Sequence, residues 1–156
     1  FGAMFFPDKV KGYAEARRVL KPAGRYVFSV WDRLEDNEFT DVVTDALATV
    51  FPQDPPRFMA RTPHGYFDAG LIRSQLGAAG FRQITVDTVS ARSRADSAHA
   101  AAVAICQGSP LRNEIEARDP KGLERATQAA ADLLARRFGS GPIEGKIQAL
   151  VATAQG

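Results

Sequence analysis

Hydrophobic positions recur every three or four residues in several stretches of the chain, which predicts amphipathic helices. The stretches are 8–20, 37–51, 68–79, 96–105 and 120–138, with a short further helix expected after Ser109-Pro110. Pro7-Asp8 and Asp68 are helix-start signals, and Gly80 ends the third stretch. Lys21-Pro22-Ala23-Gly24 predicts a type I turn that reverses the chain after the first helix.

Three other stretches predict strands. Residues 26–31 form a nearly unbroken apolar run, the pattern of a strand buried on both faces, while 81–90 alternates and 146–154 closes the chain. Helices alternating with strands predict an α/β architecture. Four prolines within 52–66 predict a stiff loop without regular structure, so that residues 34–66 form an inserted helix and a lid-like loop.

Composition narrows the class of protein. The 156 residues are 45% apolar and 24% charged, which predicts one folded domain. A net charge of +2 is too small to indicate a nucleic acid or a charged membrane as partner. Cys106, the single cysteine, is expected to be a core filler, and with no apolar run long enough to span a membrane we expect a cytoplasmic protein.

Two segments carry a resemblance to a known family. FGAMFFPD at 1–8, and RVLKPAGR at 18–25 followed by FSVWD at 28–32, closely resemble the second half of S-adenosylmethionine-dependent methyltransferases of the class I Rossmann-like type. The similar enzymes are the type 11 group that includes ubiquinone and menaquinone biosynthesis methyltransferases. Residues 1–32 match well and the remainder matches in outline. Ala23 departs from the family, which usually has a second Gly there.

The resemblance implies a fold and a function. Residues 25–31, 81–90 and 146–154 would be strands five, six and seven of a Rossmann-like sheet, with six and seven an antiparallel pair. Two features that bind the cofactor in this family, a Gly-rich loop after the first strand and an acidic residue at the end of the second, are not found in the sequence. Gly139-Ser140-Gly141 precedes a proline and a strand, so it is expected to be a linker. We therefore expect residues 1–156 to be one partial methyltransferase domain, a C-terminal portion of a parent enzyme that uses S-adenosylmethionine. This chain alone is expected to bind no cofactor and to be inactive.

The alternative is a non-catalytic module that assembles through strand 25–31. If no strand lies on its outer side, its unpaired amides and carbonyls would recruit another chain. A homodimer would then form along that edge or by exchange of the opening segment.

The carboxyl ends of the strands are expected to hold the site. Phe1, Gly2 and Met4 would line the wall near the donor sulfonium, since an aromatic face suits a cation, although an ordinary apolar strand end is as good an interpretation. Trp31 would line the pocket of a small organic acceptor. Asp32 would orient or deprotonate the acceptor, or else cap the next turn.

The proline-rich loop adds two candidates. His64 has the titration range of a base and Tyr66 could close over the acceptor, although a solvated loop histidine is the commoner case. His99 is expected to be a structural or surface residue. No spacing of His and Cys residues suggests a metal ligand set, so we predict none.

Overall fold

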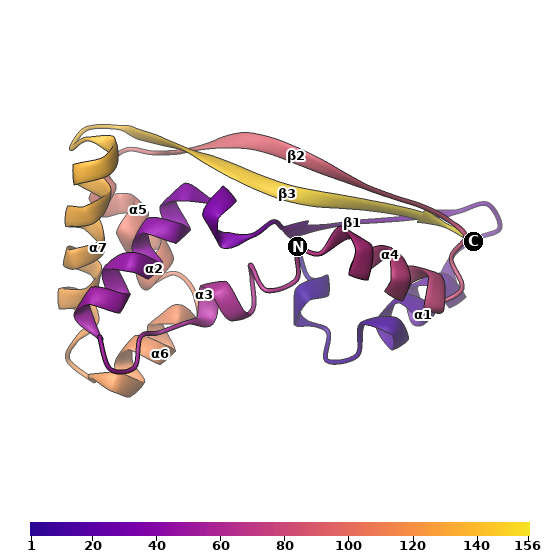
Figure 1. Cartoon of the computed structure of the whole chain (residues 1–156), viewed down its shortest axis with the longest axis horizontal. Helices are drawn as coiled ribbons and strands as arrows, with labels where there is room; N and C mark the ends of the chain where they lie inside the picture. Colours follow the sequence, from indigo (N-terminus) through magenta and orange to yellow (C-terminus); the bar gives the residue numbers. More distant parts are fainter. The chain divides into compact units, whose positions relative to one another are not determined.

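The computed structural model describes all 156 residues, and its helices and strands follow the expected order (Figure 1). The strands are β1 (Arg25–Trp31), β2 (Gln83–Ala95) and β3 (Ile143–Gln155). The helices are α1 (Lys9–Val19), α2 (Glu38–Val50), α3 (Phe58–Arg61), α4 (Ala69–Ala78), α5 (Ala98–Cys106), α6 (Leu111–Arg118) and α7 (Leu123–Phe138). Two short 3₁₀ helices, η1 (Ala3–Phe5) and η2 (Leu34–Asp36), precede α1 and α2. No helix has the length and apolar character that crossing a membrane requires.

The three strands form one sheet in the order β1-β3-β2. β3 pairs antiparallel with β1 from Arg25 opposite Gln155 to Trp31 opposite Ala149. On its other side β3 meets β2, where the Arg82 amide donates to the Gln155 carbonyl at 3.0 Å. The expected antiparallel neighbours are therefore paired, but both strands are longer than the predicted 81–90 and 146–154.

The chain forms two compact units, each with its own apolar core. Unit 1 comprises residues 1–33, 62–90 and 148–156, and unit 2 comprises residues 34–61 and 91–147. The predicted insert, 34–66, is thus divided at residue 61. Whether both units belong to one partial methyltransferase domain stays a prediction.

Tyr13 is the centre of the unit 1 core. It is fully buried, and its ring stacks on Phe28 at a centroid distance of 5.2 Å. Strand β1 contributes Tyr26, Phe28 and Val30 to this core. Val27, which lies between Tyr26 and Phe28, is 57% exposed. The prediction that β1 is buried on both faces is therefore wrong at Val27, although Trp31, on the same face, packs against the core.

Four helices, α2, α5, α6 and α7, make most of the unit 2 core. The apolar stripe predicted on the second helix is buried, as are Ala126, Ala130 and Leu134 of α7. Gly145 of β3 lies against the Phe39 ring so closely that a Cβ would stand 2.7 Å from it. Cys106 is fully buried, which confirms it as a core filler, and burial raises the pKa of its thiol to about 11.

Helix ends follow the signals in the sequence with a few exceptions. Asp8 caps α1 by accepting from the Lys11 amide, and Asp68 caps α4. Gly80 has the positive φ of 94° expected where a helix stops. Ser97, and not Asp96, caps α5. Residues 52–66 are not wholly irregular, because α3 forms after the last of the closely spaced prolines.

The turn before β1 differs from the prediction. The Gly24 amide donates to the Lys21 carbonyl at 2.8 Å, so the reversal is present. Ala23, however, has a positive φ of 61°. Since Pro22 has its φ fixed near −65°, a positive φ at the next residue makes this a type II turn, whose third position favours glycine. Ala23 is therefore strained at the position where the resembling family carries Gly.

Replacing Ala23 by glycine should raise the free energy of unfolding by roughly 0.5–1 kcal/mol. The left-handed conformation costs an L-residue about 1–2 kcal/mol, and the greater freedom of glycine in the unfolded chain offsets part of that gain. Ala23 is exposed, so the change removes no core contact. Urea unfolding of the variant measures the gain, and a loss of stability would contradict the assigned turn type.

Candidate functional site

An aromatic cluster lies at the carboxyl end of β1, within unit 1. The Trp31 ring stacks on Phe1 with centroids 4.3 Å apart and planes at 25°. The His64 ring lies 6.1 Å from Trp31. Phe1 is 60% exposed, whereas His64 is 3% exposed, so the cluster runs from solvent into the protein. Stacked aromatic faces at such a position suit a cation or a planar ligand.

A backbone contact fixes the orientation of His64. Its Nδ1 lies 2.8 Å from the carbonyl oxygen of Asp32. A carbonyl only accepts, so Nδ1 carries a proton and donates it. In the neutral ring the lone pair is therefore on Nε2. The interpretation of His64 as a solvated loop residue is wrong, because the loop carries it into unit 1.

Asp32 is held by β3. Its Oδ2 accepts from Gln148 Nε2 at 2.9 Å, and its Oδ1 accepts from the Arg33 amide at 2.8 Å. Gln148 in turn accepts from the Ser90 hydroxyl at 2.7 Å, which extends the contact to β2. Asp32 is 7% exposed. Both oxygens thus fix the chain after β1, and Asp32 supports the carbonyl that orients His64.

The tautomer of His64 is open to direct measurement. We expect ¹⁵N NMR of the neutral ring to show a protonated Nδ1 and an unprotonated Nε2 for His64. His99, the second of two histidines and exposed on α5, is the internal control and should show the tautomer mixture of a solvated ring. A protonated Nε2 as the main neutral form of His64 would contradict the assigned hydrogen bond.

The other predicted site residues are distributed differently. Met4, on η1, is 6% exposed and packs into the unit 1 core. Gly2 has open space where a Cβ would stand, so no close approach within the chain requires a glycine there. The structure thus brings Phe1, Trp31, Asp32 and His64 together. Met4 and Tyr66 lie in the core beside them.

The Tyr66 hydroxyl is engaged inside unit 1. It donates to Gln75 Oε1, so it must accept from the Tyr13 hydroxyl, which lies 3.0 Å away. Burial raises the pKa of Tyr66, although the hydrogen bond from Tyr13 acts in the opposite direction. The pKa of Tyr13 is raised mainly by burial and also by its hydrogen bond to Tyr66, so its hydroxyl keeps its proton. This chain of hydroxyls anchors the segment that carries His64 two residues earlier.

Lys9 adds a further tether to that segment. Its Nζ lies 4.7 Å from the centroid of the Tyr66 ring and donates to the Phe6 carbonyl at 3.1 Å. One side chain of α1 thereby contacts both Tyr66 and the end of the N-terminal segment. The contacts of Tyr66 are therefore with its own unit, and they hold the neighbouring segment in place.

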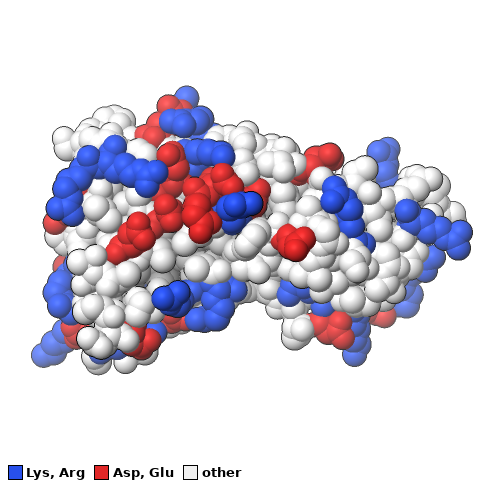
Figure 2. Space-filling view, viewed as in Figure 1, with Lys and Arg blue, Asp and Glu red and all other residues white.

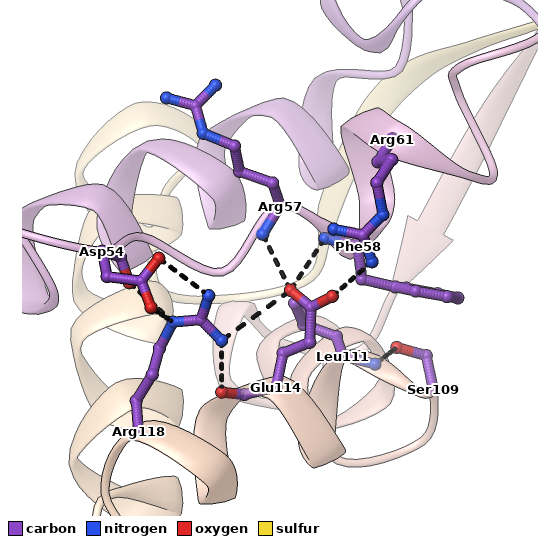
Figure 3. Close-up of polar contacts among 8 residues, drawn as sticks. All are labelled: Asp54, Arg57, Phe58, Arg61, Ser109, Leu111, Glu114 and Arg118. Atoms are coloured by element: carbon purple, nitrogen blue, oxygen red, sulfur yellow. Dashed lines mark hydrogen bonds and ion pairs between the residues drawn. The ribbon is translucent and has the colours of Figure 1, made fainter.

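The part of the predicted lid that lies in unit 2 is fastened to α6 (Figure 3). Glu114 accepts from the backbone amides of Arg57 and Phe58 at 2.9 and 3.2 Å, and it pairs with the Arg61 guanidinium. Arg118 donates to the Asp54 carbonyl at 2.6 Å. The carboxylate of Glu114 thus caps the start of α3, and residues 54–61 are held at two points.

Acidic side chains gather over η2 and α2, where Figure 2 shows a red patch. Asp36 pairs with Lys146 at 2.7 Å, and Glu38 pairs with Arg137 at 3.4 Å. Burial, together with the neighbouring Asp45, raises the pKa of Asp41. No group of three or more His, Cys, Asp or Glu residues has the arrangement of a metal site.

A hollow of about 400 Å³ lies at the amino end of β1. Arg17, Arg18 and Lys21 line it beside the turn that ends α1. Cations at that position complement the negative end of the helix dipole, and the hollow lies at the opposite end of β1 from the aromatic cluster.

Sequence reasoning missed the residues that support the site. Gln148 and Ser90 hold Asp32 from two later strands, and Gln75 and Lys9 hold Tyr66 from α4 and α1. None of these four residues belongs to a motif, and residues of these types are common on protein surfaces. Only the antiparallel register, which pairs Trp31 with Ala149, could have pointed to Gln148.

Comparison with known proteins adds little to this geometry. No protein-family model matches the chain. Among solved structures, a protein of Bacillus halodurans C-125 described as a candidate methyltransferase is similar over 99% of this chain with 12% identity and a TM-score of 0.44. This chain spans 66% of the length of that protein. A TM-score of that size does not establish a shared fold.

Proposed function

We propose that this chain is the acceptor-side portion of an S-adenosylmethionine-dependent methyltransferase that acts on a small organic molecule. The observation that carries the proposal is the cluster of Phe1, Trp31 and His64 at the carboxyl end of β1, where His64 is bonded to the backbone carbonyl of Asp32. Phe1 and Trp31 come from segments 1–8 and 28–32, whose sequence resembles this enzyme family, whereas His64 comes from a later segment. The antiparallel pairing of β3 with its neighbours also supports the proposed strands five to seven.

The residues fit one part of the donor. S-Adenosylmethionine supplies a methyl group on a positively charged sulfur, and an aromatic wall stabilises such a cation. Phe1 and Trp31 would form that wall, with Gly2 and Met4 on the same segment. The chain has no Gly-rich loop that follows a strand and opens a helix, so the grip on the nucleoside would come from residues outside this chain.

The roles of this chain's own residues follow from their contacts. Trp31 offers a flat surface to the acceptor, and His64, held by the Asp32 carbonyl, is the candidate base of the site. Asp32 keeps the loop in place, with both oxygens engaged, and is a positioning residue in this proposal. Methyl transfer needs alignment of donor and acceptor more than a catalytic triad, so a rigid wall and one base suffice.

Calorimetric titration of S-adenosylmethionine tests the proposal. We expect no binding to this chain, and binding to a longer protein that includes the residues encoded upstream. In the longer protein, Trp31→Ala should weaken binding about 5- to 30-fold, the equivalent of a cation–π contact of about 1–2 kcal/mol. Val89→Ala, at an exposed valine of β2, is the matched control and should leave affinity unchanged. Absence of binding to either protein would overturn the proposal.

A further inference from the structure

Lys9 stands at a position that helix α1 itself disfavours. It is the first residue of α1, and the first turn of that helix has no acidic residue. The Asp8 carboxylate, just before it, caps the helix by accepting from the Lys11 amide. The amino end of a helix has a partial positive charge, so a cation there is unfavourable. Lys11 is exposed to solvent, which screens its charge, but Lys9 is half-buried and needs partners from other parts of unit 1.

The first partners of Lys9 are carbonyls at the end of η1. Its Nζ donates to the Phe6 carbonyl at 3.1 Å and lies 3.5 Å from the Met4 carbonyl. The last carbonyls of a helix have no partner within the helix, and a lysine side chain can supply one. Lys9 therefore caps η1 from outside, and η1 contacts β1. The stacking of Phe1 on Trp31 depends on the path of this segment.

The other partner of Lys9 is the ring of Tyr66. Nζ lies 4.7 Å from the ring centroid, within the range of a cation–π contact. Tyr66 is 5% exposed, and its hydroxyl bonds Tyr13 and Gln75, so the ring has a fixed place in the core. Exclusion of water strengthens such a contact. His64 lies two residues before Tyr66, so one ammonium joins the segment before α1 to the segment that carries His64.

We infer that Lys9 is a positioning residue of the candidate site: its ammonium holds residues 1–4 and residues 64–66 at a fixed separation. Within the proposed function, on which this role rests, the first segment faces the methyl donor and the second faces the acceptor. A lysine suits this task because its ammonium has three N–H groups and can contact carbonyls and a ring face at once. A neutral side chain of similar length would leave the carbonyls without this hydrogen bond and the ring without its cation.

Removal of the charge separates this role from an effect on helix α1. Without partners outside the helix, Lys9→Met would be neutral or stabilising, because methionine is as good a helix former and does not oppose the dipole. Lys11→Met, exposed in the same turn, is the matched control that shows the helix effect alone. Lys9→Arg keeps a cation that can bond carbonyls and lie over a ring, so it should restore most of the wild-type behaviour.

Acrylamide quenching of Trp31 fluorescence measures the effect on the aromatic cluster. Trp31 is the single tryptophan, and its ring is stacked on Phe1. In Lys9→Met we expect the quenching constant to rise most of the way to that of Phe1→Ala, in which the stack is absent. Lys11→Met and Lys9→Arg should stay near the wild-type value. Circular dichroism checks that each variant folds.

Calorimetric titration of S-adenosylmethionine into the longer protein gives the functional readout. Lys9→Met should weaken the affinity about 2- to 10-fold, the equivalent of one cation–π contact or hydrogen bond, while Lys9→Arg and Lys11→Met should bind as the wild type does. If the longer wild-type protein binds no methyl donor, the proposed function fails, and the quenching comparison still decides whether Lys9 holds the two segments. Unchanged quenching in Lys9→Met, an equal change in Lys11→Met, or a donor affinity that does not depend on Lys9 would overturn the inference.

Discussion

Replacing Tyr13 by alanine should lower the free energy of unfolding of unit 1 by about 3–5 kcal/mol. The side chain is fully buried, and its ring contacts the rings of Phe6, Tyr26 and Phe28 at centroid distances of 6.2, 6.1 and 5.2 Å. Alanine would leave a cavity in this aromatic core. It would also remove the hydroxyl that donates to Tyr66, and with it one anchor of the segment that carries His64.

Trp31 makes this loss measurable. It is the single tryptophan of the chain and lies in unit 1, so its fluorescence during urea unfolding reports on that unit. Tyr13→Phe is the matched control: it keeps the ring and loses one hydrogen bond, with an expected cost of about 1 kcal/mol. Equal effects of the two variants would contradict the claim that the buried ring, more than the hydroxyl, stabilises unit 1.

Replacing Glu114 by alanine should cost about 2 kcal/mol in unit 2. The carboxylate accepts from two backbone amides and from Arg61, and hydrogen bonds to a charged group are worth about 1.5–3 kcal/mol, less where solvent screens them. We expect faster hydrogen exchange at the amides of Arg57 and Phe58. Glu116→Ala, on the same helix with an exposed partner in Arg112, is the matched control and should cost less than about 1 kcal/mol.

The stabilisation by Glu114 should depend on pH. Partial burial raises the pKa of its carboxyl, but the hydrogen bonds from Arg61 and from the Arg57 and Phe58 amides outweigh that effect and lower it. A group with a lowered pKa in the folded state stabilises the protein above its unfolded pKa and loses that effect as the pH falls through the folded value. The difference in unfolding free energy between the wild type and Glu114→Gln should therefore shrink on acidification. A difference that grows would contradict the assigned ion pairs.

Most of the local structure follows from patterns that span a few residues. Helix caps at Asp8 and Asp68, the apolar stripe of α2 and the linker before β3 all lie where the sequence predicts them. These features depend on side chains that bond or pack with neighbours three or four positions away. Apolar periodicity of that kind can be detected without knowledge of the tertiary structure.

Features that depend on distant partners were predicted less well. The exposure of Val27 depends on which elements cover β1, and an apolar run cannot specify that. The positive φ of Ala23 was missed because Pro22 and Gly24 suit both turn types. At the candidate site, the chemistry-bearing residues Asp32 and His64 could be named from the sequence. Their contact through a backbone carbonyl could not be predicted, because it joins segments 32 residues apart.

The position of β3 has a consequence for how the protein is made. β3 leaves the ribosome after β1 and β2, yet it supplies a hydrogen-bonding partner of both. Until residues 143–155 emerge, neither earlier strand has its β3 partner. Nascent chains, and chains that terminate early, would therefore expose two strands that lack this partner and should depend on chaperones or proteases to avoid aggregation.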